Sequence, residues 1–186
     1  LVNLKEAPIE KITATGVQTT DNSYDLDVII YATGFDAITG ELTRMNIRGE
    51  NDQSLKEAWA DGVKTYMTFQ TSGFPNFFLI NGTVFCNFTR CAEVVADWVS
   101  ECIDYMNQNG YQKIGTNEQS EQEWTEYAES LTEGMIFTKA KTGNWFMGTN
   151  VAGKKKQFLF YAGGAIEFRE RCEKVAKSGY EGFQLS

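Results

Sequence analysis

The chain has 186 residues, of which 42% are hydrophobic, and it carries a formal net charge of -8. This length and apolar share suit one domain or a piece of a larger protein, while the acidic balance disfavours non-specific binding to nucleic acid or to an anionic membrane. No apolar run approaches the ~18 residues of a membrane span and no signal segment opens the chain, so we expect a soluble, cytoplasmic protein.

Two residue types limit the chemistry that the chain can perform. It contains no histidine, which excludes Ser-His-Asp and Cys-His catalysis and the usual zinc sites within these residues. The cysteines lack metal-ligand spacing and the density of a disulfide scaffold, so we expect four reduced packing residues: Cys86, Cys91, Cys102 and Cys172. Any reaction must therefore depend on a cofactor or on another segment.

The N-terminal region reads as part of a sheet. Residues 9–13 and 16–19 have the pattern of short strands joined by a tight turn. Residues 28–32 form a continuous apolar run, which is typical of a strand buried on both faces of an α/β sheet. A hairpin and one buried strand leave sheet edges unpaired, so we expect residues 1–186 to be the C-terminal part of a longer chain.

The middle of the chain predicts a short helix and two further strands. Ser54 and Glu57 have capping-box spacing, and Gly62 is placed to end a helix that begins after Ser54. Residues 66–69 and 76–81 are strand-like runs on either side of a Gly-Phe-Pro turn.

The C-terminal half predicts helices, because its apolar residues recur at helical spacing. The longest helix is expected from Ala92 to about Gly110. Two more are expected over about 120–134, with a glutamate-rich solvated face, and about 165–178, ending at Gly179.

Read in order, five segments resemble the C-terminal portion of Baeyer–Villiger monooxygenases. They are "DVIIYATGFDAITG", "SGFPNFFLING", "FCNFTRCAE", "NWFMGTNVAGKKKQFLFYAGG" and "GYEGFQL". The most specific is Trp145-x-x-Gly148-x-Asn150-x-x-Gly153-Lys154, which aromatic residues and Gly163-Gly164 follow. One departure is the loop around Gly82, which is shorter than the resemblance implies and puts the shape of the flavin-side pocket in doubt.

The resemblance implies an α/β fold, as the C-terminal part of a flavoprotein with two dinucleotide-binding domains. Residues 1–90 would supply strands that complete the FAD and NADP domains, together with a flavin-side loop. Residues 91–186 would form the helical and mobile-loop part of the FAD domain. The partner would be the upstream remainder of the same enzyme.

The implied reaction inserts one oxygen atom of O2 beside a ketone carbonyl, through a C4a-peroxyflavin, and gives an ester or lactone. FAD and NADPH would be the cofactors, and the hard chemistry would belong to the flavin. The glycine-rich fingerprints and the catalytic arginine of the family are not found here, so we expect no catalytic residue in this chain and no activity from it alone. The alternatives are a flavin enzyme that oxidises nitrogen or sulfur, and a non-catalytic binding module.

The resemblance also implies site residues. Thr33 and Gly34 would lie near cofactor, where small residues let a ligand approach the backbone, although an ordinary glycine turn explains them equally. Asp36 could simply cap a turn. Asn87 would contact cofactor or cap the long helix.

Phe85 and Phe88 would line the ketone pocket, and Phe88 would also approach the cofactor, whereas Cys86 would only fill space. Trp145 would reach the nicotinamide ribose through its indole N–H from a mobile loop, or would merely pack beneath that loop. Lys154 would assist the pyrophosphate or point to solvent beside two further lysines.

Overall fold

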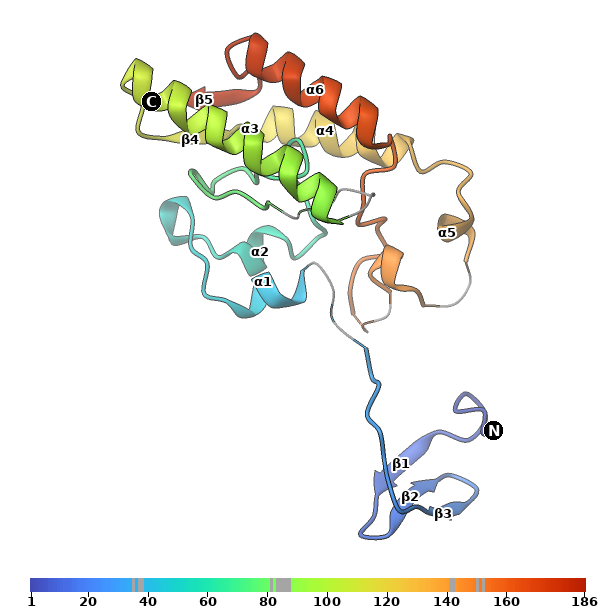
Figure 1. Cartoon of the computed structure of the whole chain (residues 1–186). Helices are drawn as coiled ribbons and strands as arrows, with labels where there is room; N and C mark the ends of the chain where they lie inside the picture. Colours follow the sequence, from blue (N-terminus) through green and yellow to red (C-terminus); the bar gives the residue numbers. More distant parts are fainter. Residues whose placement is uncertain are drawn as a thin grey trace. The chain divides into compact units, whose positions relative to one another are not determined.

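The computed structural model describes residues 1–34, 36, 39–80, 82, 88–140, 143–149, 151 and 153–186. The chain forms two compact units, Leu1–Phe35 and Asp36–Ser186. Figure 1 colours the chain along its sequence, with the small unit in blue and the larger one from cyan to red.

The small unit is an antiparallel sheet of three strands in the order β1-β2-β3, namely β1 (Ile9–Ile12), β2 (Gly16–Thr19) and β3 (Ser23–Asp25). The first two confirm the predicted hairpin, whereas the third was not predicted. Gly16 allows the close pairing of β2 with β3, because a Cβ there would lie 1.9 Å from the Tyr24 carbonyl oxygen.

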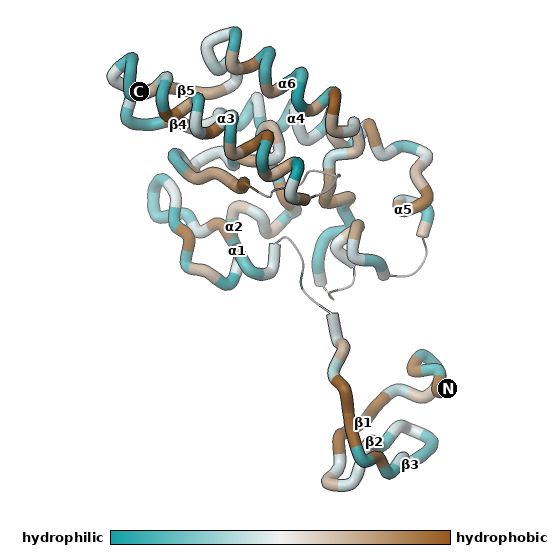
Figure 2. Tube along the Cα trace, in the orientation of Figure 1, coloured by the Kyte–Doolittle hydropathy of each residue, from teal (hydrophilic) through white to brown (hydrophobic). Residues whose placement is uncertain are grey.

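The apolar run at residues 28–32 does not form the buried strand that the sequence predicts. It has no strand assignment, and Val28, Ile30 and Tyr31 expose 73%, 85% and 69% of their surface. Figure 2 shows the run as a brown stretch following β3. No strand within the described residues pairs with it, so its buried surroundings are not supplied by this part of the chain.

The larger unit contains the three predicted long helices. They are α3 (Phe88–Asn109), α4 (Glu118–Ser130) and α6 (Ala165–Lys177), and α3 begins four residues before the predicted start. The antiparallel pair β4 (Ile114–Thr116) and β5 (Phe183–Leu185) follows α3 and α6 in the chain, respectively (Figure 1).

Short helical elements lie before α3 and between α4 and α6. At α2 (Leu55–Ala58), Ser54 and Glu57 form the predicted capping box, and Leu55 is fully buried beneath it. The remaining short elements are α1 (Gly40–Arg44), η1 (Glu50–Asp52), α5 (Ile136–Lys139) and η2 (Trp145–Met147).

Two strand predictions are wrong. Residues 66–69 turn sharply, because Met67 and Thr68 adopt left-handed backbone with φ of 52° and 68°. Only an isolated bridge joins Tyr66 to Gln70 there. Among residues 76–81, the described part likewise contains no strand, and Asn76 has φ of 58°. An apolar run can serve as a buried loop when tertiary packing demands it.

The core of the larger unit is aromatic. Trp98 of α3 is 4% exposed and packs against Phe69, Tyr180 and Phe183, with centroid distances of 4.7, 5.2 and 5.3 Å. Its indole N–H donates to the Cys172 carbonyl of α6 at 3.0 Å. One side chain therefore joins both helices and the loop that precedes α3.

The prediction of reduced cysteines is wrong for Cys91. Cys91 is disulfide-bonded, whereas Cys102 and Cys172 are free and buried. Burial raises the pKa of the Cys172 thiol to about 12 and that of Cys102 to about 11, so both behave as inert packing groups.

Glu121 departs from the predicted solvated face of α4. It is 7% exposed, and its Oε1 accepts a hydrogen bond from the Ser72 backbone N–H at 2.8 Å. Burial is the largest influence on this carboxyl, and it raises the pKa of Glu121 above the ordinary value despite that hydrogen bond.

We predict that Glu121→Gln stabilises the protein at neutral pH. The raised pKa means that the folded state binds a proton more tightly than the unfolded state. The contribution of Glu121 to stability is therefore greatest below its unfolded pKa and is lost as pH rises through its folded pKa. Glutamine keeps the acceptor for Ser72 but never ionises. Thermal midpoints measured from pH 4 to 8 should diverge in favour of the variant as pH rises. Glu126→Gln, at an exposed position of α4, should show no such divergence.

Candidate functional site

Trp145 lies in a tight turn formed by residues 144–149, which we term the tryptophan turn. The Asn144 side chain accepts a hydrogen bond from the Met147 N–H at 3.0 Å, and the Asn144 N–H donates to Thr149 Oγ1 at 3.0 Å. Gly148 ends the η2 turn with φ of 64°, which favours glycine. The Trp-x-x-Gly spacing thus fixes one tight loop that carries the indole.

The indole of Trp145 is half-buried against other rings. It packs edge-on to Phe146 at 5.4 Å and tilted on Phe160 at 5.2 Å. Trp59 and Trp98 donate their indole N–H groups to backbone carbonyls, but that of Trp145 has no acceptor within the residues that the structure describes. The ring is therefore held in place while its donor stays available.

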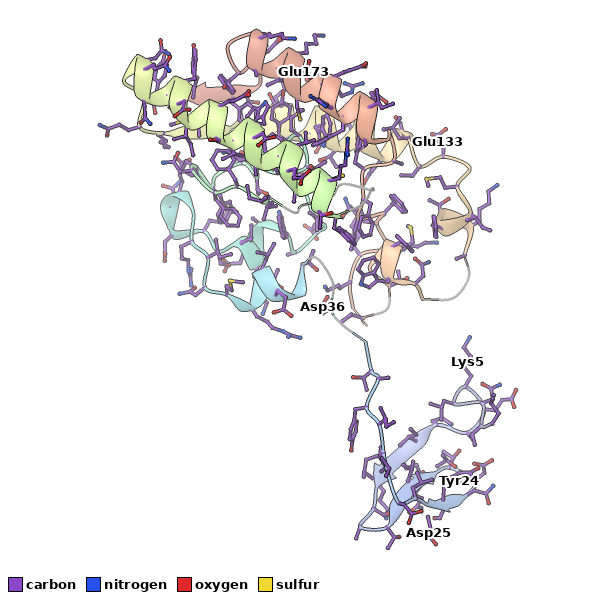
Figure 3. All side chains as sticks on the ribbon, in the orientation of Figure 1. Lys5, Tyr24, Asp25, Asp36, Glu133 and Glu173 are labelled. Atoms are coloured by element: carbon purple, nitrogen blue, oxygen red, sulfur yellow. The ribbon has the colours of Figure 1, made fainter. Side chains whose placement is uncertain are left out.

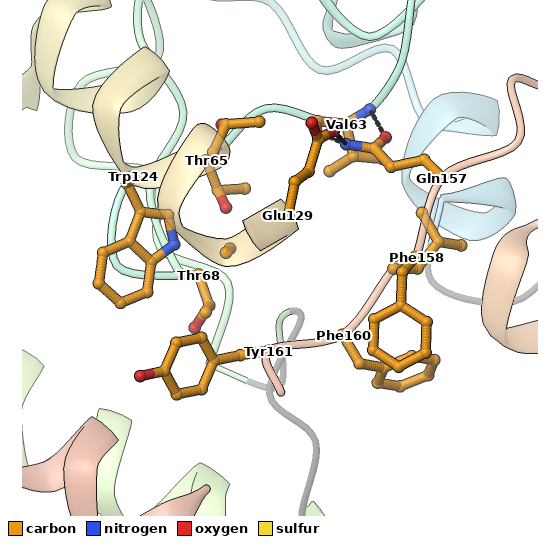
Figure 4. Close-up of a pocket in the computed structure, with 12 residues that line it drawn as sticks. Val63, Thr65, Thr68, Trp124, Glu129, Gln157, Phe158, Phe160 and Tyr161 are labelled. Carbon is orange, nitrogen blue, oxygen red and sulfur yellow. Dashed lines mark hydrogen bonds between the residues drawn. The ribbon is translucent and has the colours of Figure 1, made fainter. Parts of the chain in front are cut away.

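The chain returns alongside the tryptophan turn over residues 157–161. The Gln157 and Leu159 N–H groups donate to the Met147 and Phe146 carbonyls at 3.2 and 2.9 Å. The Gln157 side-chain amide accepts from the Val63 N–H and donates to the Val63 carbonyl, both at 2.9 Å (Figure 4). This paired contact ties the returning segment to the loop before Tyr66.

A cavity of about 30 Å³ lies beside this segment, and Figure 4 shows its lining. The buried Thr68 hydroxyl lines it and has no hydrogen-bond partner. A space of this size accommodates a water molecule or two but no ring of a substrate or cofactor.

Lys154 is not directed to solvent. Its Nζ donates to Asp36 Oδ1 and to Thr39 Oγ1, and the Lys154 and Asp36 side chains are 27% and 21% exposed. Asp36, labelled in Figure 3, opens the larger unit. This ion pair therefore joins the first residue of the larger unit to the segment that follows the tryptophan turn.

The aromatic residues after the tryptophan turn lead into a polar cluster against α4 and α6. The Tyr127 hydroxyl donates to Glu167 Oε1 and lies 3.3 Å from the Tyr161 hydroxyl, while the Arg171 guanidinium lies 4.0 Å from the centre of the Tyr127 ring. Burial raises the pKa of the Tyr161 phenol, which therefore stays protonated. Gly163 is required here, since its Cβ would meet the Tyr161 hydroxyl at 2.2 Å.

The other predicted site residues are not brought together by these contacts. Gly34 has φ of 81°, and a Cβ at this position would have no atom within 4 Å; Thr33 is exposed beside it. Phe88 is the first residue of α3 and is 46% exposed. Phe85, Asn87, Cys86 and Asn150 lie outside the described residues. Roles for these residues remain predictions.

Sequence reasoning missed three polar partners, namely Thr39, Gln157 and Val63. Gln157 and Val63 are 94 positions apart, and Thr39 is 115 positions from Lys154. Local sequence spacing cannot predict contacts between residues so far apart. Among the described residues, no group of acidic residues and cysteines could hold a metal ion, and no helix has the length and apolarity to cross a bilayer.

No protein-family model matches the chain. The chain is nevertheless similar over its whole length to part of several flavin-dependent or ketone monooxygenases. The whole chain is 41% identical to 2-oxo-Delta(3)-4,5,5-trimethylcyclopentenylacetyl-CoA monooxygenase from Pseudomonas putida and covers 35% of that enzyme. It is also 35% identical over its whole length to phenazine N-monooxygenase PhzNO1 from Lysobacter antibioticus, of which it covers 34%.

Two solved structures agree with these relatives. The closed structure of cyclohexanone monooxygenase superposes with a TM-score of 0.93 at 37% identity, over 100% of this chain and 35% of that one. The structure of OTEMO in complex with FAD and NADP gives 0.91 at 41% identity, over 100% and 34%. The resemblance drawn from the sequence, with its α/β fold class, is confirmed, and the chain spans about one third of the length of the proteins that it matches.

Proposed function

We propose that the chain is the C-terminal third of an FAD- and NADPH-dependent Baeyer–Villiger monooxygenase. The whole enzyme would insert one oxygen atom of O2 beside a ketone carbonyl and release an ester or lactone. The observation that carries the proposal is the match of the entire chain to cyclohexanone monooxygenase at a TM-score of 0.93.

The remainder of that enzyme would be the partner of this chain. The exposed apolar run at residues 28–32 supports this view, because so much unpaired apolar surface is rare on a finished domain. In the proposal, residues 1–90 complete the dinucleotide-binding domains and residues 91–186 form the helical and mobile-loop part of the FAD domain.

The bound flavin would supply the oxygen-transfer chemistry. Trp145 fits a role beside the nicotinamide cofactor, since its half-buried ring presents an N–H without an acceptor among the described residues. Thr33 and Gly34 would allow close approach of cofactor to backbone, while Phe85 and Phe88 would shape an apolar ketone site that excludes water. Lys154 would act through Asp36 more than through a phosphate.

The test is to purify the full-length enzyme and record its visible spectrum. A stoichiometric flavin band, NADPH oxidation that depends on cyclohexanone and O2, and a lactone product would support the proposal. A protein without flavin, or one that oxidises NADPH without oxygenating any ketone in a broad panel, would contradict it.

A nitrogen-oxidising flavin enzyme is the second candidate, because the chain is 35% identical to a phenazine N-monooxygenase and 34% and 33% identical to cyclohexanone and cyclopentanone monooxygenases. The two functions differ in product. Mass spectrometry after incubation with a phenazine and with cyclohexanone, in separate reactions, distinguishes an N-oxide from a lactone.

A further inference from the structure

The ion pair between Lys154 and Asp36 is partly buried, whereas ion pairs of surface lysines are usually exposed to solvent. Both side chains are less than one third exposed, and Thr39, which accepts a second hydrogen bond from Lys154, is 7% exposed. The next two lysines are different. Lys155 is exposed, and Lys156 is exposed and reaches only the Thr138 carbonyl at 3.2 Å.

The acceptors of Lys154 are fixed by the local backbone. The Gly40 N–H donates to the Asp36 carbonyl at 3.1 Å, and the Thr43 hydroxyl donates to the Thr39 carbonyl at 2.8 Å. Gly40 leaves room for the Asp36 side chain, because a Cβ there would lie 2.4 Å from both Cβ and Cγ of Asp36. The Asp36 carboxylate and the Thr39 hydroxyl are therefore both held in position to accept hydrogen bonds from the Lys154 ammonium group.

Lys154 lies on the segment that returns to the tryptophan turn. Three residues later, Gln157 pairs with the Met147 carbonyl, while its side chain is fastened independently to Val63. The Lys155 carbonyl lies 3.8 Å from where a Cβ of Gly148 would be. A constraint on Lys154 thus acts directly on the backbone that carries Trp145.

We propose that Asp36 is a positioning residue for the tryptophan turn. By holding Lys154, it fixes the orientation in which Trp145 serves the nicotinamide cofactor, and it thereby limits wasted NADPH oxidation. This inference rests on the proposed function. In this proposal Asp36 acts only through Lys154, and Thr39 assists it as a neutral acceptor.

The test uses full-length enzyme with Asp36→Asn, which keeps the shape of the side chain and removes its charge. Hydrogen exchange of peptides covering 143–159 should quicken roughly 5- to 30-fold, as expected for loss of one partly buried charged hydrogen bond. Peptides from α6 should be unchanged. Hydrogen peroxide formed per NADPH should rise and KM for NADPH should increase more than kcat falls, while Thr39→Val should give a smaller change in the same direction.

Lys154→Met and Lys155→Met form a matched pair of charge deletions one residue apart. The first should reproduce Asp36→Asn, and the second should behave as wild type. The double variant Asp36→Asn/Lys154→Met should be no worse than either single variant, because both remove one interaction. A lysine that instead served the cofactor pyrophosphate would make the double variant clearly worse, and this result would overturn the proposal.

Unchanged exchange of 143–159 in Asp36→Asn would also overturn it, as would faster exchange with an unchanged ratio of peroxide to NADPH. Failure of the proposed function is recognised separately. It appears in wild-type enzyme as absent ketone-dependent turnover, whereas the exchange measurements report on Asp36 in either case.

Discussion

Replacing Trp145 with alanine in the full-length enzyme is expected to lower ketone-dependent turnover roughly 5- to 150-fold and to raise hydrogen peroxide per NADPH. The indole would contribute one hydrogen bond and ring packing, together about 1 to 3 kcal/mol in the closed arrangement. Because the ring also contacts Phe146 and Phe160, alanine removes packing as well as the N–H donor.

Trp145→Phe separates these contributions. It keeps an aromatic ring against Phe160 but has no N–H, so its thermal midpoint should stay near wild type while coupling is still impaired. Rates, peroxide yield and midpoint should be measured for both variants. A large fall in midpoint with normal coupling in Trp145→Ala would show that the residue only packs beneath its loop.

Replacing Trp98 with alanine should destabilise the protein by about 3 to 5 kcal/mol, the range for loss of a large buried aromatic side chain. The cavity would open between α3, α6 and Phe69, and the Cys172 carbonyl would lose its donor. Trp98→Phe should cost less, since it retains much of the packing and loses chiefly the hydrogen bond.

The control for this prediction is Ile166→Ala on α6, whose side chain is 78% exposed. It also removes apolar atoms from a helix of this unit, yet it should change stability by no more than about 0.5 kcal/mol. Scanning calorimetry of the three variants gives the comparison. Equal small shifts for Trp98→Ala and Ile166→Ala would contradict the central place of Trp98 in the core.

The long helices are predicted well from the sequence because each buries one face, so its apolar residues recur with the period of a helix. The buried positions of α3, including Val95, Trp98 and Cys102, repeat at helical spacing and need no knowledge of the partner surface. The α2 capping box is likewise local, and it is confirmed. Ile166 shows the limit of the method, since it belongs to the apolar pattern of α6 but faces solvent.

Strands and polar partnerships are harder to predict because they depend on distant residues. Residues 66–69 have strand composition, yet two left-handed residues turn them back. From the sequence, Lys154 was expected to contact the cofactor pyrophosphate or solvent. In the structure its partner is Asp36, a residue 118 positions away. The Trp-x-x-Gly motif coincides with the tryptophan turn, but spacing alone could not reveal the hydrogen bonds that hold this turn.

The exposed run at residues 28–32 also bears on colloidal behaviour. It combines β-branched and aromatic residues with no proline and no charge, the composition of segments that stack between copies of a chain. Asp25 and Asp27 precede it directly and act as gatekeepers, because stacking in register would bring like charges together. As long as no neighbouring strand covers residues 28–32, the charges of Asp25 and Asp27 are the nearest ones that oppose self-association of this run.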